Sequence, residues 1–329
     1  MIRVIAPTHG HRLPFYLAIE EWVARNMPAA EYFFTWRVKP TVIFGRNQNP
    51  MVEVDMEYCL EKGIEVYRRR SGGGCVYADM DNLMMSYITP STDVTATFAG
   101  YTARVAGMLR SLGLDATASG RNDVLIGGKK VSGNAFYHLP GRSIVHGTML
   151  HSTDTANMAR AITPSRSKLE SNKVASVESR ITTISEHLPH LNVDDLEQHI
   201  IDSFTDRSYT LTPADIAQVE ELEQRYYDMK WRFGNRGILG APKDQRRILR
   251  RVEGVGEIDT VLTLDGNVIA DIDITGDFFL LSDLDSGLLD RIRGCARDHG
   301  SLSLALEGSD ASKVIAGLST SQFIEYLTT

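Results

Sequence analysis

Residues 68–82, RRRSGGGCVYADMDN, place three adjacent arginines beside three adjacent glycines, with only Ser71 between them. Glycine has no Cβ, so the backbone can approach a ligand closely and adopt φ angles that other residues avoid. Arginine presents a permanently charged fork that suits a carboxylate or a phosphate. The segment therefore predicts a site where an anionic small molecule lies against bare backbone, although a turn or a bulge would also explain the glycines.

A second polar and basic segment lies at residues 120–135, GRNDVLIGGKKVSGNA. It is followed by VHGT at 145–148 and by SVESRI at 176–181. Taken with the first segment, this set of motifs is far more specific than the glycine run alone. The polar and basic side chains of the second segment are Arg121, Asn122, Asp123, Lys129, Lys130, Ser132 and Asn134.

In order and spacing, the motifs RR-x-S-GGG, GRND, K-x-SG-N-A, HGT and SVxSRI resemble those of the lipoate-protein ligase family, within the biotin and lipoate protein ligase superfamily. The resemblance covers roughly the first 185 residues, and the remainder resembles the family's accessory domain. It implies a catalytic domain that binds lipoate and ATP at residues 1–240, and a small α+β C-terminal accessory domain at 246–329.

Hydrophobic periodicity independently indicates an α+β protein, with a mixed or antiparallel sheet flanked by helices, because strands and helices do not alternate regularly. We expect the strands at 32–38 and 41–44 to pair across Lys39-Pro40, and Glu20-Glu21 to face outward from a helix at 14–26. Further strands are expected at 2–6, 64–67, 83–88, 124–126, 130–137 and 143–150, and helices at 56–62 and 96–112.

The C-terminal third shows a helix pattern at 213–228, then a glycine-, proline- and charge-rich stretch at 235–245 that is typical of a linker. Residues 261–274 predict a hairpin that turns at Asp265-Gly266, and residues 284–297 predict a helix. The resemblance implies that residues 231–234 and the linker form the hinge of the accessory domain. Residues 165–174 predict an exposed loop.

Bulk properties restrict the class of protein. The chain has 329 residues and a formal net charge of −7, which argues against a nonspecific nucleic-acid binder. No apolar run approaches ~18 residues, so no membrane span is expected, and the start does not resemble a signal peptide. Three scattered cysteines favour a reducing compartment. We expect a cytoplasmic protein, with a processed organellar form left open.

Joining a fatty-acid-like carboxylate to a lysine requires activation, because hydroxide is a poor leaving group. Conversion of the acid to an acyl-adenylate by ATP solves this problem, and cations, usually with Mg²⁺, offset the repulsion between the two anions. A Walker A loop is excluded. Counted from Gly128-Lys129, its pattern needs glycine at position 123 and serine or threonine at position 130, but these positions hold Asp123 and Lys130. ATP must therefore bind on another scaffold.

The resemblance assigns roles residue by residue. Lys130 would be the catalytic lysine and would contact the acyl-adenylate at its carbonyl and phosphate, whereas Lys129 more simply fits a solvent-facing lysine. Asp123 would face the nucleotide and is also the candidate metal ligand. The residues implied for lipoyl binding are Arg69, Gly72, Gly73, Gly74 and His146, and those for nucleotide binding are Val76, Tyr77, Asn122, Asp123, Lys130, Ser132, Gly133, Asn134 and Ala135.

The chain departs from the family pattern at Ala78, where histidine is expected, and at Asp81, where glycine is expected. Asn172-Lys173 also replaces a Lys-Gly pair. The change at position 78 would remove a titratable group near the nucleotide. Cys75, directly after the glycines, could be a nucleophile, although most free cysteines are buried packing residues.

The favoured function is an ATP-dependent ligase that forms lipoyl-AMP and transfers the lipoyl group to a lysine of a carrier. Its substrate would be lipoate or octanoate. Its carriers would be lipoyl domains of 2-oxoacid dehydrogenase E2 subunits or the glycine cleavage H protein, with no nucleic-acid or membrane partner. Alternatives are an octanoyl or lipoyl transferase that needs no ATP, a non-catalytic acyl-binding paralogue and, less favoured by the arginine-glycine order, a biotin ligase.

Overall fold

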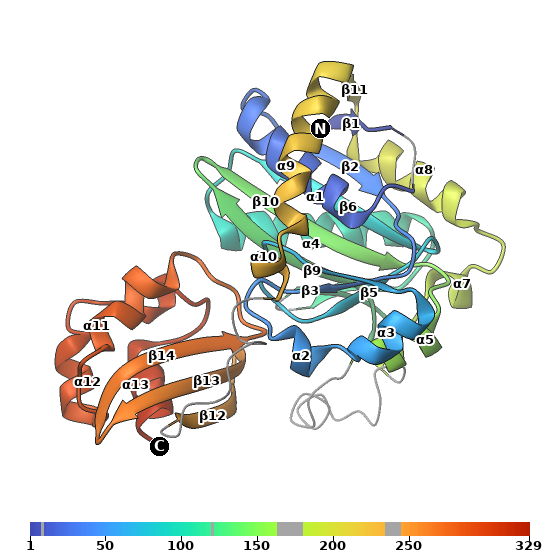
Figure 1. Ribbon diagram of the computed structural model, residues 1–329. Helices are drawn as coiled ribbons and strands as arrows, with labels where there is room; N and C mark the ends of the chain where they lie inside the picture. Colours follow the sequence, from blue (N-terminus) through green and yellow to red (C-terminus); the bar gives the residue numbers. More distant parts are fainter. Residues whose placement is uncertain (8–9, 120–121, 163–179, 234–244) are drawn as a thin grey trace.

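A computed structural model describes residues 1–7, 10–119, 122–162, 180–233 and 245–329 (Figure 1). The N-terminal part is built on an eight-stranded sheet with helices on both faces and a second, three-stranded sheet beside it. The C-terminal part holds another three-stranded sheet with its own helices. The expected α+β class is therefore confirmed. No helix in the described ranges is both long and apolar enough to span a membrane.

The large sheet has the order β11-β1-β2-β6-β10-β9-β8-β7. It is a mixed sheet, because β1 runs parallel to both β2 and β11 while the other pairs are antiparallel. The strands expected at 124–126, 130–137 and 143–150 are confirmed as β8, β9 and β10, which pair in sequence as an antiparallel meander. The strand bounds are β1 Ile2–Ile5, β2 Tyr32–Trp36, β6 Asn82–Thr89, β7 Ala116–Ser119, β8 Asp123–Ile126, β9 Lys129–Leu139, β10 Arg142–Leu150 and β11 Arg207–Thr210.

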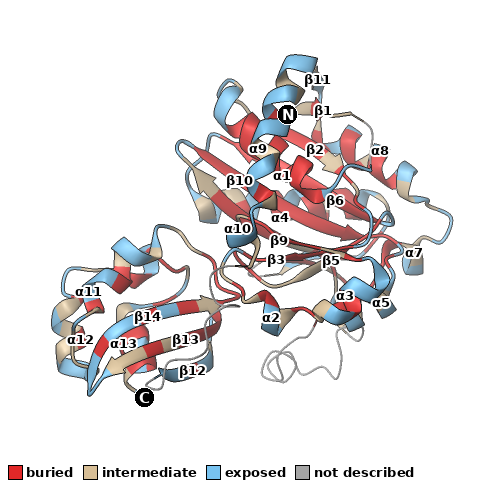
Figure 2. Cartoon of the chain, in the orientation of Figure 1, coloured by how far each residue is buried: buried red, intermediate tan, exposed pale blue. Residues whose placement is uncertain are grey.

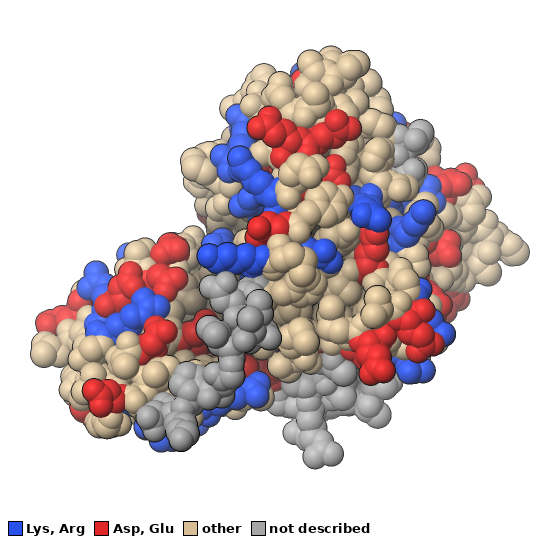
Figure 3. Space-filling model, in the orientation of Figure 1, with Lys and Arg blue, Asp and Glu red and all other residues tan. Residues whose placement is uncertain are grey.

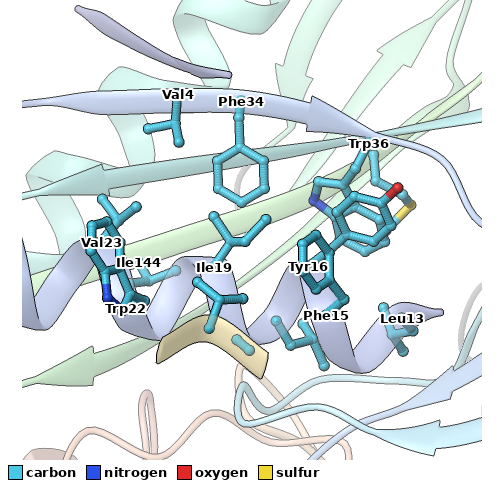
Figure 4. Close-up of a cluster of buried hydrophobic side chains, with 14 of the residues drawn as sticks. Val4, Leu13, Phe15, Tyr16, Ile19, Trp22, Val23, Phe34, Trp36 and Ile144 are labelled. Atoms are coloured by element: carbon cyan, nitrogen blue, oxygen red, sulfur yellow. The ribbon is translucent and has the colours of Figure 1, made fainter. Parts of the chain in front are cut away.

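Helices cover both faces of this sheet. Residues alternate between the faces of a strand, so Phe33 and Phe34 of β2 enter different hydrophobic clusters. The helices α1 (Leu13–Asn26) and α9 (Pro213–Tyr227) pack on the face of Phe34, shown in Figure 4. On the other face lie α4 (Val94–Ser111) and α8 (Val193–Phe204). The short helix α7 (Ile184–His187) precedes α8 in the chain, and the short helix α10 (Met229–Phe233) follows α9.

The expectation for Glu20 and Glu21 was wrong, because both side chains are completely buried. The helix α1 is packed between the sheet and α9, so it has no wide solvent-facing side. Each carboxylate is compensated by polar partners: Glu21 contacts Arg25 and Arg70, and Glu20 contacts His146. A buried charge is tolerated only when it is paired in this way.

The pairing expected across Lys39-Pro40 was also wrong. The strand β2 already has a neighbour on each edge, so β3 (Thr41–Phe44) joins a separate sheet instead. There β3 lies between β4 (Glu65–Arg68) and β5 (Val76–Ala78). The helices α2 (Pro50–Glu53), α3 (Met56–Lys62) and α5 (Thr155–Ala161) accompany this sheet. Gly63 ends α3 in a left-handed conformation, which a residue without a Cβ adopts readily.

The C-terminal sheet has the order β12-β13-β14, with bounds Gln245–Val252, Gly256–Asp265 and Val268–Gly276. It has its own hydrophobic core, visible as a second group of buried residues in Figure 2. The helix expected at 284–297 is shorter: a π-helical turn at Asp285–Leu289 continues as α11 (Asp290–Ile292), and Arg293 is extended. The remaining elements are α12 (His299–Ala305), a 3-10 turn at Ala311–Lys313 and α13 (Thr320–Thr328).

Candidate active site

A cavity of about 240 Å³ opens beside β5, β9 and β10 and extends to the C-terminal domain. Its wall combines two kinds of side chain. Apolar groups come from α1, β2 and β6, and include Leu13, Leu17, Trp36 and Met84. Polar and charged groups come chiefly from β8 and β9 and the segment that follows residue 179. Such a wall suits a ligand with an apolar part and an anionic part.

Two cations share one carboxylate on this wall. The Lys130 Nζ atom lies 2.7 Å from Asp123 Oδ1, and Arg180 Nη2 lies 3.2 Å from Asp123 Oδ2. Asp123 is buried, whereas the side chains of Lys130 and Arg180 are 25% and 34% exposed. The group therefore carries one net positive charge that faces the cavity.

The local structure places Lys130 there. The pairing of β8 with β9 shifts register between Val124 and Leu125, which marks a bulge at this point. The Lys130 carbonyl accepts a hydrogen bond from Thr182 N at 2.9 Å, so the chain after Arg180 is joined to β9. A Cβ at Gly133 would lie 2.4 Å from Lys130 Nζ, so only glycine lets the lysine lie across this position.

An asparagine pair closes the adjoining wall. Asn122 Nδ2 donates to Asn134 O at 2.9 Å, and Asn134 N and Nδ2 both donate to Asn122 O. Within the described ranges the buried Asn134 Oδ1 accepts no hydrogen bond. A buried acceptor left unpaired is costly, and Asn134 lines the cavity, so a ligand that donates a hydrogen bond would satisfy it.

The arginines of residues 68–70 do not present their forks to the cavity. Arg69 donates to the carbonyls of Gly72 (2.6 Å), Gly74 (2.8 Å) and Ile43 (2.9 Å), and to Ser71 Oγ. Burial lowers the pKa of Arg69 to about 10, which still leaves it charged at neutral pH. Arg69 therefore supports the glycine loop from behind.

The two neighbouring arginines are committed in the same way. Arg68 donates to the carbonyls of Arg46 (2.6 Å), Gln48 (2.9 Å) and Trp231 (2.8 Å). Arg70 Nε lies 3.0 Å from Glu21 Oε2. The three guanidinium groups thus fix backbone and a buried carboxylate, and the sequence interpretation of them as forks facing a ligand needs correction.

A buried hydrogen-bonded chain links the helix α1 to the glycine loop. His146 Nδ1 lies 3.0 Å from both carboxylate oxygens of Glu20, and His146 Nε2 lies 2.6 Å from Ser71 Oγ, which also accepts from Arg69 Nε at 2.8 Å. The order Ser-His-Glu is that of a nucleophilic triad. However, Ser71 is completely buried and does not line the cavity. The hydrogen-bonded series from Glu20 through His146 and Ser71 therefore holds Arg69 in position.

Most residues predicted for the site meet at the cavity. Gly72 does not, because it faces the C-terminal domain, where a Cβ would lie 2.3 Å from the Phe278 carbonyl oxygen. Ser132 does not either, because it is completely buried. The predicted residues on the cavity wall are Arg69, Gly73, Gly74, Val76, Tyr77, Asn122, Asp123, Lys130, Gly133, Asn134, Ala135 and His146.

The two departures from the family pattern lie away from the cavity wall. Ala78 is completely buried in the hydrophobic cluster around α1, and Asp81 is exposed in the turn that precedes β6. Cys75 does line the cavity. Residues 172–173 lie outside the described ranges, as do the expected loop at 165–174, Arg121 and most of the linker.

Sequence reasoning did not assign several residues of the wall. Trp36 was taken as part of a strand, and Arg180 was quoted within a motif without a role. Arg251, Asp277 and Phe279 come from the C-terminal domain. No local signal distinguishes them, because they reach the cavity only through the docking of one domain on the other.

Comparison with known proteins agrees with the geometry. The pattern of the lipoyl protein ligase A/B catalytic domain matches residues 13–205, and that of the bacterial lipoate protein ligase C-terminus matches residues 241–327. The lipoate-protein ligase LplJ of Bacillus subtilis is 31% identical over 322 residues, which are 94% of this chain and 95% of the relative. Lipoate-protein ligase 1 of Staphylococcus aureus is 30% identical over 302 residues, 89% of this chain and 90% of the relative.

Solved structures show the same fold. P. falciparum LipL1, in complex with lipoate, has a TM-score of 0.77 at 18% identity and covers 99% of this chain and 98% of its own. A lipoate-protein ligase A bound with ATP has a TM-score of 0.63 at 25% identity, over 71% of this chain and 98% of its own.

A bi-partite lipoate protein ligase from Thermoplasma acidophilum, described with its E2 lipoyl domain, has a TM-score of 0.64 at 26% identity, over 74% of this chain and 98% of its own. The family patterns match both domains, and the LplJ relative is similar over nearly the whole chain. Both findings indicate the same family. This chain belongs to the lipoate-protein ligase family and is an enzyme of the ligase class.

Proposed function

We propose that the cavity activates lipoate with ATP to lipoyl-AMP and then passes the lipoyl group to a lysine of a carrier domain. The observation that carries this proposal is a single cavity in which an apolar wall, including Leu17 and Trp36, adjoins the charged group of Lys130, Asp123 and Arg180. An acyl-adenylate has the same division, with an apolar tail and a charged phosphate. The neighbours with lipoate and with ATP support the same pair of ligands.

In the first step the lipoate carboxylate attacks the α-phosphate of ATP, and pyrophosphate leaves. Lys130 offers an ammonium that offsets the repulsion between the two anions once its contact with Asp123 is exchanged for the phosphate. In the second step the amine of the carrier attacks the acyl carbonyl and AMP leaves. The same ammonium then stabilises the negative charge that develops on the carbonyl oxygen.

Asn122 and Asn134 are proposed to hold the nucleotide. Their mutual hydrogen bonds fix the backbone of this wall, and the unpaired Asn134 Oδ1 can accept from an amino or hydroxyl group of ATP. Arg69, Gly73 and Gly74 are proposed to shape the acyl slot, with Arg69 acting through the loop carbonyls that it binds. His146 contributes to the wall and to the support of Arg69.

A magnesium ion is the further cofactor that we propose, with Asp123 as its protein ligand. The described residues contain no group of three or more histidine, cysteine or acidic residues that could hold a metal. Proteins commonly bind Mg²⁺ with one or two carboxylates together with substrate phosphates. The residues present therefore fit an ion that arrives with ATP. Such an ion supplies positive charge on the phosphate under attack.

The carrier is proposed to be a lipoyl domain of an E2 subunit or the glycine cleavage H protein, which is supported by the lipoyl domain described with the Thermoplasma ligase. Octanoate is a second acyl substrate that the same slot would accept. We also propose a cytoplasmic location, in keeping with three cysteines that form no disulfide within the described ranges. Domain limits of 1–240 and 246–329 remain our proposal, with the hinge at residues 231–245.

The test of this function is lipoate-dependent exchange of pyrophosphate into ATP, followed by lipoyl transfer to an E2 lipoyl domain. We expect both activities in the wild-type protein, and loss of about 10²- to 10³-fold in Lys130→Ala. The matched control is Lys129→Ala, because this neighbouring lysine is exposed and does not line the cavity. Activity of Lys130→Ala within a few-fold of the control would remove Lys130 from the mechanism.

One further variant separates the ligase from a transferase of the same fold. Cys75 lines the cavity, so it is placed where a nucleophile would be needed for transfer through a thioester. We expect Cys75→Ser to retain ATP-dependent transfer. Complete loss of transfer with intact lipoate binding would instead favour the transferase.

A further inference from the structure

The C-terminal domain forms part of the cavity wall. Phe279 stacks on Phe136 of β9, with ring centroids 5.1 Å apart, and lies against Gly73, where a Cβ would meet its ring at 3.1 Å. Backbone bonds hold the two domains together here: Gly73 N donates to Phe278 O at 3.3 Å, and Gly276 N donates to Asn47 O at 2.8 Å. The docked domain therefore has a defined register against the glycine loop.

This docking brings a cation, Arg251 of β12, to the cavity that Lys130 also lines. The Nη1 atom of Arg251 makes no hydrogen bond within the described ranges and is completely shielded from solvent. The closest carboxylate oxygen paired with it is Asp277 Oδ2, at 3.9 Å. Asp277 also lines the cavity, and its other oxygen accepts from Glu257 N at 2.6 Å.

The other arginines of β12 have partners within their own domain. Arg247 makes two hydrogen bonds of 2.8 Å to Asp259, and Arg246 donates to the carbonyl of Thr329 at 3.0 Å. Arg250 lies over the ring of Tyr326, 6.0 Å from its centroid. Because adjacent strand residues point to opposite faces, Arg250 and Arg251 project to opposite sides of the sheet. Only the second reaches the cavity.

A shielded guanidinium N–H without an acceptor is unfavourable, and an anion in the cavity would supply the acceptor. The cations of the catalytic domain on this wall are already engaged: Lys130 and Arg180 with Asp123, and Arg69 with loop carbonyls. Arginine also suits phosphate oxygens through its planar fork. The group in the proposed reaction that needs such a donor is the phosphate chain of ATP, whose charge shifts onto pyrophosphate as it leaves.

We propose that Arg251 is a catalytic residue for adenylation that the C-terminal domain supplies, and that it donates hydrogen bonds to the phosphate oxygens of ATP. This inference rests on the proposed function. In that step a bond forms between a lipoate oxygen and the α-phosphorus, and the bond to the β-phosphate oxygen breaks. Pyrophosphate leaves with the electron pair and no proton is transferred. Arg251 offsets the charge on the departing group, so adenylation requires the docked domain.

The second step has no pyrophosphate, so it should not depend on Arg251. We expect Arg251→Met, which keeps most of the aliphatic stem, to lower pyrophosphate exchange by about 10²- to 10³-fold. Transfer from preformed lipoyl-AMP to an E2 lipoyl domain should stay within a few-fold of wild type. Arg251→Lys should recover part of the exchange, because it restores the charge without the fork. The matched control, Arg250→Met, should leave both steps unchanged.

The inference is overturned if Arg251→Met exchanges pyrophosphate as fast as the control, or if it loses both steps equally with an unchanged melting temperature. A variant that unfolds is recognised by its melting temperature, and Arg251→Lys then decides the matter: wild-type exchange supports a charge at this position, and exchange as low as that of unfolded protein overturns the proposal. Absence of exchange in the wild-type protein would contradict the proposed function itself, so the two failures are distinguishable.

Discussion

Gly133 shows how one missing Cβ can determine the position of a reactive group. The Lys130 side chain passes over Gly133 and reaches Asp123, and both contacts depend on the space that glycine leaves. Gly147 has the same role for Asn134, because a Cβ there would lie 1.9 Å from Asn134 Oδ1. At these two glycines the missing Cβ leaves room for a neighbouring side chain. At Gly72, after Ser71, it leaves room for a neighbouring backbone segment.

Gly133→Ala should therefore impair catalysis more than folding. The added Cβ would meet Nζ and Cε of Lys130 at 2.4 and 2.5 Å. These atoms end a flexible chain, so the lysine can move while the backbone stays in place. We expect pyrophosphate exchange to fall by about 10-fold or more, with a melting temperature close to that of wild type.

The control for this variant is Gly100→Ala in α4, where no atom lies within 4 Å of the added Cβ. Alanine is the better helix former, so the control should gain about 0.5–1 kcal/mol in free energy of unfolding and keep full activity. Full activity of Gly133→Ala would mean that Lys130 reaches the adenylate from a different position.

At the scale of elements, the strand β9 carries much of the site. Lys130, Gly133, Asn134 and Ala135 lie on the cavity at its N-terminal half. His138 lies near its other end, where its Nδ1 contacts Ser143 Oγ of β10 at 3.1 Å and its buried Nε2 has no hydrogen-bond partner within the described ranges. Burial lowers the pKa of His138, although a backbone contact with Arg142 opposes this in part.

The lowered pKa of His138 predicts acid sensitivity. The unfolded chain takes up a proton on this residue at about pH 6.5, whereas the folded chain does so only at lower pH. Below about pH 6.5 the unfolded state therefore binds more protons, and the free energy of unfolding decreases as the pH falls through the folded pKa.

Urea unfolding at several values between about pH 7.5 and about pH 5 would measure this effect. His138→Gln cannot take up the proton, so the variant should lose less stability than wild type over the same range. Equal losses in the two proteins would show that His138 does not contribute to the acid sensitivity.

At the scale of the whole molecule, activity is expected to depend on how the two domains dock. Gly72 lies at their contact, where a Cβ would come within 2.3 Å of the Phe278 carbonyl oxygen and 3.1 Å of the Phe279 Cα atom. Both are backbone atoms, which cannot move aside without shifting the domain. Gly72→Ala should therefore release the C-terminal domain and leave each core intact.

Small-angle X-ray scattering would detect the release as a larger radius of gyration, and circular dichroism would report intact secondary structure. Pyrophosphate exchange should fall together with docking, because Arg251 and Phe279 leave the cavity. Gly100→Ala serves again as the control. A Gly72→Ala protein with the dimensions of wild type would show that the interface accommodates the methyl group.

The surface of the molecule agrees with the charge balance of the chain. On the face shown in Figure 3, basic and acidic side chains are interspersed over both domains. No single sign dominates that face, and the formal net charge of the whole chain is −7.

Local sequence patterns were sufficient to predict those strands and helices that have one buried face and a clear end signal in the sequence. The three strands of the meander from β8 to β10 were expected from their residue pattern, and the structure joins them by short turns at Gly127-Gly128 and Gly141. The helices expected at 56–62 and 96–112 are α3 and α4, and the glycines that follow them, Gly63 and Gly113, both adopt positive φ. These features depend on neighbours in the chain, so they can be read without the tertiary structure.

Local patterns failed where burial comes from distant elements. The periodicity of α1 suggested an exposed face for Glu20 and Glu21, but α9 covers it. Arg69 had the chemistry of an anion-binding group, but its donors are taken by carbonyls that the fold brings to it. Residue type and spacing alone do not show which hydrogen-bond and ion-pair partners folding brings to a side chain.

By itself, the sequence determined the family, the α+β class, the meander of the catalytic sheet and the set of residues that could perform the chemistry. These depend on residue type, spacing and short-range conformational preference. Only the tertiary structure decided which side chains share a cavity, which charges are buried with partners and which domain contributes Arg251 and Phe279. The physical reason is that burial and pairing are set by contacts between residues far apart in the chain. The spacing of residues along the sequence does not specify such contacts.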